Sequence, residues 1–168
     1  MRNVRNCGAV LLLMALMAGA CLADQPAPPA KFYKLDFVVK EVEGGKVVNT
    51  RTYSAMVSSH DTSRACSIRT GGRIPYNTGK EYMYLDVGVN IDCLHVNEAQ
   101  NGLSLWIDAD ISSVVQESTT NTDRPFLRQN KWGSTVLVPL KKPTVVFSSD
   151  DLNGRHQTQL ELTATPIT

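Results

Sequence analysis

The chain has 168 residues, of which 20% are charged and 42% hydrophobic, and its formal net charge at pH 7 is +1. This length suits one domain with a substantial core and is short for two. A net charge near zero gives no electrostatic reason to expect a nucleic acid as a partner.

Residues 1–23 have the pattern of a secretory signal peptide. Two arginines precede an uncharged apolar run over residues 8–18, which is about half as long as a membrane-spanning helix. Cleavage after Ala23 places small residues, Ala23 and Cys21, at the −1 and −3 positions where a signal peptide is cut. We therefore expect an exported protein, periplasmic or secreted, whose mature chain begins at Asp24 and contains no transmembrane segment.

Cys21 also allows a second interpretation. The residues Ala18-Gly19-Ala20-Cys21 resemble the bacterial lipobox, in which the cysteine is lipidated and becomes the new N-terminus. The match lacks the usual leucine at −3, and short motifs of this kind have many false positives. A lipoprotein anchored through Cys21 is therefore the alternative to an unlipidated exported chain.

Export also determines which cysteines remain. The mature chain keeps Cys66 and Cys93, and two cysteines in an oxidising compartment predict a disulfide. Alternation places both side chains on the apolar sides of their strands, as a bridge requires. Two separately buried free thiols are the alternative.

Residues 24–31 are predicted to form a proline-rich tether, and residues 32–168 a single β domain. Three prolines in the tether disfavour both helix and sheet interior. From residue 32 onward the apolar residues alternate with period two, which is typical of half-buried strands.

The first predicted strands lie in YKLDFVVKEV and KVVNTRTYSAMV, which flank the hairpin signal Gly44-Gly45. RACSIRT forms the next strand, and we expect a Gly- and Pro-containing loop from Gly71 to Gly79 after it. The clearest alternation follows in EYMYLDVGVNIDCLHV and in LSLWIDADI, which are separated by a turn at Gln100-Asn101-Gly102.

Three β-branched-rich runs complete the chain: STVLVPL, PTVVF and TQLELTA. About eight strands at hairpin spacing predict an all-β fold, mainly antiparallel, arranged as a sandwich or a barrel-like domain.

An acidic cluster is predicted on the outward side of two neighbouring strands. A turn at residues 100–102 places Asp92 opposite Asp110, with Asp108 two residues away. Like charges that face each other are destabilising, and a divalent cation such as calcium would compensate them. A metal-dependent or hydrolase-like enzyme using these carboxylates is therefore one hypothesis. The simpler interpretation is a solvated face balanced by Arg or Lys from a neighbouring strand, without metal or cofactor.

Three aromatic residues also fall on the polar sides of their strands: Trp106, Tyr82 and Tyr84. Outward aromatics of this kind can form a contact patch for a protein or a glycan. The simpler expectation is that a second sheet or a loop covers them, because exposed large aromatics are uncommon without a function.

Catalytic and metal-binding motifs are absent from the sequence: it contains no Cys-x-x-Cys, His-x-x-x-His or Gly-x-Ser-x-Gly pattern. The sequence therefore predicts a non-enzymatic exported module, binding or envelope-structural, whose partner is a protein or glycan of the envelope.

The C-terminal third resembles a known family. Its elements are, in order, Arg124-Pro125-Phe126, the strand around Val136, a tight turn and the strand around Val146. They are similar to the closing strands of the secretin β-domain of bacterial outer-membrane secretion channels. This resemblance covers residues 124–148. Secretins usually place glycine in the turn where this chain has Lys141-Lys142-Pro143. The resemblance implies a related β topology in an envelope protein, not a pore.

Overall fold

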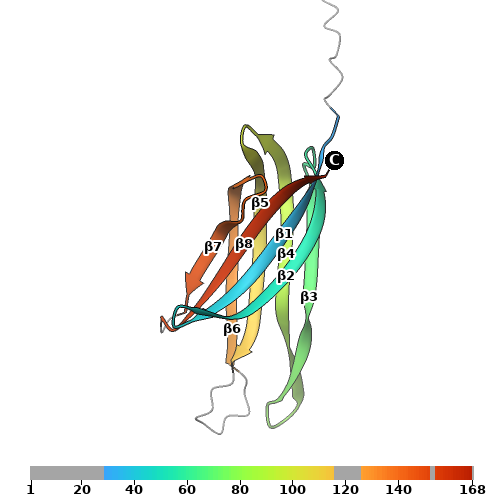
Figure 1. The fold of residues 1–168 in the computed structure, drawn as a ribbon. Helices are drawn as coiled ribbons and strands as arrows, with labels where there is room; N and C mark the ends of the chain where they lie inside the picture. The colour runs from blue at the N-terminus through green and yellow to red at the C-terminus, as the bar shows by residue number, and fades with distance from the viewer. Residues whose placement is uncertain (1–28, 116–125, 152–153, 168) are drawn as a thin grey trace, which may run out of the picture.

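The computed structural model describes residues 29–115, 126–151 and 154–167, and they form two four-stranded antiparallel sheets (Figure 1). The strand order is β2-β1-β8-β7 in the first sheet and β3-β4-β5-β6 in the second. The strands are β1 (Phe32–Glu43), β2 (Lys46–Ser58), β3 (Arg64–Asn77), β4 (Tyr82–Ala99), β5 (Gly102–Val115), β6 (Phe126–Pro139), β7 (Thr144–Asp150) and β8 (His156–Ile167). The predicted all-β sandwich of about eight strands is confirmed.

None of the described residues forms a helix with the length and hydropathy that crossing a membrane requires. The signal peptide, Cys21 and most of the tether lie outside the described residues, and residues 29–31 of the tether have no regular secondary structure.

The core lies between the two sheets, where the period-two positions meet. In β1, Leu35 and Phe37 are fully buried, and in β5 the same is true of Leu105 and Ile107. Strands pleat so that alternate side chains leave opposite faces, which is why β1 and β5 each contribute every second residue. The remaining buried apolar residues are Tyr33, Val39, Val57, Cys66, Val89, Ile91, Cys93, Val96, Leu103, Ala109, Ile111, Val138, Leu160, Leu162 and Ala164.

The predicted hairpin at Gly44-Gly45 is confirmed. Glu43 pairs with Lys46, so only the two glycines form the loop. Their φ angles are +55° and +78°, the left-handed conformation that a two-residue type I′ turn needs at both positions.

The expected loop from Gly71 to Gly79 is wrong over most of its length, because β3 continues to Asn77. Gly71 lies directly opposite Gly88 of β4, and a Cβ on Gly88 would lie 2.0 Å from the carbonyl oxygen of Thr70. Glycine at both positions therefore lets the two backbones approach closely. Pro75 is tolerated because β3 is an edge strand with one side unpaired.

The predicted register of the β4–β5 hairpin is also wrong. Ala99 pairs with Gly102, and the register then shifts between Leu94 and Asn97, where His95 has a φ of +52°. This β-bulge inserts a residue in β4 and changes which side chains face each other. Asp92 consequently lies opposite Asp108, and Asp110 lies opposite Asn90.

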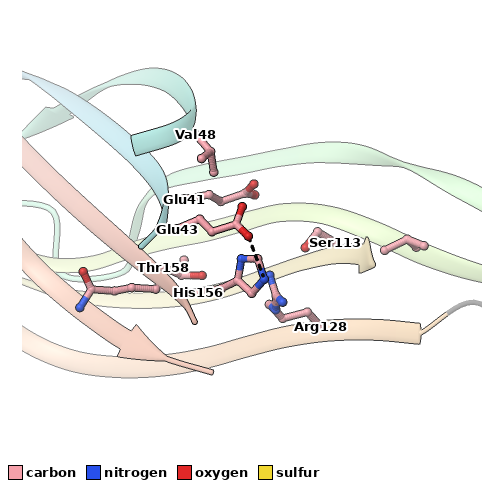
Figure 2. Close-up of a pocket in the computed structure, with 9 residues that line it drawn as sticks. Glu41, Glu43, Val48, Ser113, Arg128, His156 and Thr158 are labelled. Atoms are coloured by element: carbon pink, nitrogen blue, oxygen red, sulfur yellow. Dashed lines mark ion pairs between the residues drawn. The ribbon is translucent and has the colours of Figure 1, made fainter. Parts of the chain in front are cut away.

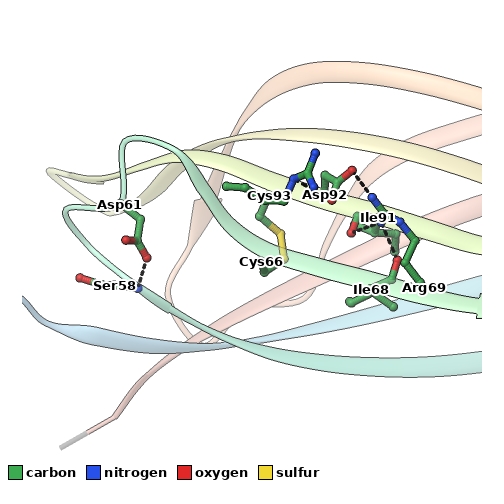
Figure 3. The surroundings of a disulfide bond; sticks show 9 residues. Ser58, Asp61, Cys66, Ile68, Arg69, Ile91, Asp92 and Cys93 are labelled. Atoms are coloured by element: carbon green, nitrogen blue, oxygen red, sulfur yellow. Dashed lines mark hydrogen bonds and ion pairs between the residues drawn. A yellow bond between two sulfur atoms is a disulfide. The ribbon is translucent and has the colours of Figure 1, made fainter.

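The predicted disulfide is present, so the two cysteines are not free thiols. Cys66 of β3 pairs in register with Cys93 of β4, with their Cα atoms 4.8 Å apart, and the two sulfur atoms are bonded (Figure 3). Both side chains point into the core, with 7% and 0% of their surfaces exposed. The bridge thus joins an edge strand to its neighbour beneath the sandwich surface.

Candidate functional site

The second sheet presents a polar outer face, formed by the outward side chains of β3, β4, β5 and β6. On it, Arg69 contacts Asp92 with an N–O distance of 2.6 Å, and Arg64 approaches the other oxygen of the same carboxylate at 3.4 Å (Figure 3). Lys131 of β6 lies 3.3 Å from Asp110. Cations from neighbouring strands, which the simpler interpretation expects, therefore lie beside both of these carboxylates.

The arginines also change the acidity of Asp92. Partial burial disfavours its charged form, but hydrogen bonds from Arg69 and Ser67 and the charges of Arg69 and Arg64 outweigh that effect. The pKa of Asp92 is therefore lowered from its ordinary value of 3.8.

This lowered pKa predicts acid sensitivity. The folded-state pKa lies below the unfolded one, so the contribution of Asp92 to stability is complete above the unfolded value, about pH 4, and disappears as the pH falls through the folded value. We expect Asp92→Asn to be less stable than the wild type at pH 6 and to lose less stability than the wild type on acidification to pH 3. Urea denaturation across this range measures both effects.

Asp86→Asn is the matched control for this experiment. Its partner is Arg73, and both side chains are more than 70% exposed, so solvent weakens their attraction. Equal acid dependence in Asp92→Asn and the wild type would contradict the assigned role of Asp92.

The three candidate metal ligands are not assembled into a site. Within the described ranges, no group of three or more His, Cys, Asp or Glu side chains is arranged to hold a metal ion. The bulge turns Asp110 toward Asn90 rather than toward Asp92. Arg69 binds one oxygen of Asp92, and the other oxygen lies 3.4 Å from Arg64 without a hydrogen-bond partner in the described part of the chain.

A trough of about 450 Å³ crosses the outer face. Its floor contains Gly71, Gly88 and Ser112, which lie in one row across β3, β4 and β5. The Ser112 hydroxyl accepts a hydrogen bond of 3.0 Å from the Gly88 N–H, which keeps this side chain close to the backbone. Six long or charged polar side chains also line it: Arg69, Arg73, Asp86, Asn90, Asp110 and Gln129. The trough can therefore offer hydrogen bonds to a polar ligand.

Trp106 lies on the same outer face and is 40% exposed. The indole atom Cζ2 is only 3.2 Å from the position that a Cβ on Gly133 would occupy, so glycine leaves room for the ring over β6. The expectation that a sheet or loop covers this aromatic is wrong, because the first sheet packs on the opposite face. A half-exposed ring above a glycine is available to a ligand.

The two tyrosines of the expected patch lie elsewhere. Tyr82 and Tyr84 are 71% and 63% exposed, but among the described residues their part of β4 pairs with β3 alone. Along β4, Tyr84 is roughly 33 Å from Leu94, the residue opposite Trp106. The three aromatics are therefore outward, as predicted, but they do not form a single patch.

A second cavity, of about 300 Å³, opens between the two sheets at the end where β1 and β2 turn (Figure 2). Glu43 lies 3.8 Å from His156, Glu41 pairs with Arg51, and Arg128 also lines the cavity. Sequence reasoning missed this group because it comes from β1, β2, β6 and β8. The sequence contained one signal of it. Glu41 follows Phe37 and Val39 at the two-residue spacing of a strand, so its side chain is expected on the same inward side.

Comparisons with known proteins support the fold. No protein-family model and no curated protein matches the chain. Two structures of InvG, the secretin of the Salmonella SPI-1 type III secretion injectisome, are similar, each with a TM-score of 0.50 and 9% identity over 83% of this chain. A third similar structure is the type II secretion system secretin XcpQ from Pseudomonas aeruginosa, with a TM-score of 0.41 and 13% identity over 82% of this chain and 57% of XcpQ.

This chain spans less than two thirds of the InvG chains, covering 64% of one and 45% of the other. At 9% identity the likeness concerns the fold alone. The resemblance drawn from residues 124–148 is nevertheless confirmed at that level: the chain has a β fold similar to that of secretins.

Proposed function

We propose that the protein is a non-enzymatic, exported module of the bacterial envelope that binds a protein or glycan through its outer face. The observation that carries this proposal is the position of Trp106, half-exposed above Gly133 on the same face as the polar trough. Aromatic side chains of this kind often supply much of the affinity of a binding surface.

The pairing of the carboxylates favours binding over catalysis. Asp92 and Asp110 are each held by a cation from a neighbouring strand, and the pKa of Asp92 is lowered rather than raised. A general acid needs a pKa near the working pH, which this environment does not give to Asp92. The fold gives further support to the proposal, because it is similar to that of InvG, the secretin of a type III secretion injectisome.

Binding to an envelope fraction tests the proposal. We expect the mature chain to co-sediment with envelope material and Trp106→Ala to reduce this binding by roughly tenfold or more, as loss of an aromatic anchor does. Tyr84→Ala is the control, because it removes an exposed aromatic far from Trp106. Protease treatment of the envelope distinguishes a protein partner from a glycan. Equal binding by Trp106→Ala and the wild type would contradict the proposed surface.

Export predicts a defined N-terminus. We expect the protein recovered from the envelope or medium to begin at Asp24 and to carry no lipid, since Ala23 completes the small-residue cleavage signal. Intact-mass measurement checks this directly. A diacylglyceryl mass on an N-terminal Cys21 would instead establish the anchored form.

The metal-dependent alternative predicts a different result in calorimetry. We expect titration with calcium at millimolar concentration, the weak end of extracellular calcium modules, to give no binding heat, because the positive charges of Arg69 and Arg64 already compensate the Asp92 carboxylate. The control is Asp110→Asn. A heat that this variant abolishes would support the metal-dependent enzyme and contradict the solvated face.

A further inference from the structure

Each sheet has two open edges, and three of these four edges carry features that oppose pairing with another strand. Proline, bulges, short length and charge all protect exposed edges. β7 has 7 residues and a register shift, and it follows Lys141-Lys142-Pro143. β3 contains Pro75, two adjacent glycines and three arginines, and β6 contains Gly133, Pro139 and two cations.

The fourth edge, β2, is different over residues 49–58. This segment has no proline, no glycine and no shift in its register with β1. Its one charged residue, Arg51, pairs with Glu41 of β1. β2 therefore offers a long, regular row of backbone hydrogen-bonding groups.

The apolar layer beneath β2 is also incomplete at this edge. Tyr53 and Ala55 point inward and pack against the core, yet both remain partly exposed. Within residues 29–115, 126–151 and 154–167, no further strand follows β2 in the first sheet. One more strand beside β2 would cover these two side chains.

We propose that this strand is β2 of a second copy, paired antiparallel about a two-fold axis at Tyr53. Such an axis places Arg51 opposite Ala55 of the second copy, so the two Arg51 side chains do not face each other. On the outward side, Thr52 meets Ser54 of the second copy, and both are uncharged. A two-fold interface must be complementary to itself, and this register satisfies that condition. The two first sheets then join into one eight-stranded sheet.

Light scattering coupled to size-exclusion chromatography tests the dimer. We expect the wild-type mature chain to have the mass of two copies and Thr52→Lys/Ser54→Lys to have the mass of one, because each new lysine faces a lysine of the second copy. Within one copy the lysines lie beside Val38 and Asp36, so the variant is expected to keep its fold. Circular dichroism and thermal unfolding verify this.

The matched control is Val145→Lys/Thr163→Lys. These residues lie on the outward side of β7 and β8, opposite Glu161 and Asp36, and the variant adds the same charge away from β2. It should remain dimeric. A wild-type chain that is monomeric at every concentration, or a dimer that the control disrupts and the β2 variant does not, would overturn the proposal.

Cysteine substitution tests the register. Tyr53→Cys should cross-link two copies on oxidation, because the axis brings residue 53 of each copy together. Ala55→Cys faces Arg51 of the second copy and should not. Cross-linking through residue 55 alone would overturn the proposed axis. Because β2 lies outside the outer face, Trp106→Ala should leave the dimer intact, so this proposal and the proposed function can fail independently.

Discussion

Removal of the Cys66–Cys93 disulfide is expected to lower the free energy of unfolding by about 3.5 kcal/mol. The bridge joins residues 27 apart, and the chain-entropy model assigns a loop of this length about that value, through restriction of the unfolded chain. For a domain of this size the melting temperature should fall by roughly 10 °C. Thermal unfolding of the double variant Cys66→Ala/Cys93→Ala measures the effect without burying unpaired hydroxyl groups.

The control for this prediction is chemical reduction. Dithiothreitol should lower the melting temperature of the wild type and leave that of the double variant unchanged. If the wild type unfolds at the same temperature with and without the reductant, the bridge does not stabilise the protein.

Replacement of Gly88 by alanine is expected to destabilise the protein by about 3 kcal/mol, at the upper end of the effects of overpacking. The added Cβ would lie 2.0 Å from the Thr70 carbonyl oxygen and 2.5 Å from the Cα of Gly71, and both are backbone atoms that cannot rotate away. The two strands would have to separate at this point. Chemical denaturation of Gly88→Ala measures the loss.

Gly72→Ala is the matched control, since Gly72 also lies in the β3–β4 strand pair, next to Gly71. A Cβ on Gly72 would meet no atom within 4 Å, and its φ is not in the left-handed region. Its stability should stay near that of the wild type or rise slightly, because alanine restricts the unfolded chain. Equal losses in the two variants would show that the close approach of Gly71 and Gly88 is not responsible.

Properties that depend on local alternation could be predicted from the sequence. The inward parity of Leu103, Leu105 and Ile107 matches their complete burial, because a pleated strand fixes the side of each residue without reference to the rest of the fold. Parity likewise placed Cys66 and Cys93 inside and Trp106 outside. The hairpin at Gly44-Gly45 followed from the conformational freedom of glycine alone.

Properties that depend on the pairing partner could not be predicted in the same way. The bulge at His95 changed the residue that lies opposite Asp92. Its one sign is that the buried positions of β4 change from odd to even residue numbers, from Cys93 to Val96. To predict that β3 continues through Gly71, one would have to know that Gly88 lies opposite it. The exposure of Trp106 depended on which face the first sheet covers, and its separation from Tyr84 on how far β4 extends beyond β5.

The central position of β1 in the first sheet also determines the order in which the chain can fold. β1 pairs with β8 along its whole length, from Phe32 opposite Ile167 to Glu43 opposite His156, whereas each strand of the second sheet pairs with the next one in sequence. Contacts between distant residues form slowly because a long loop must close first. The hairpins of the second sheet can therefore form early, whereas the first sheet is complete only after β8 has paired with β1. A chain that ends before β8 would keep the disulfide-bonded hairpin but leave Phe37 and its apolar neighbours exposed to aggregation and proteolysis.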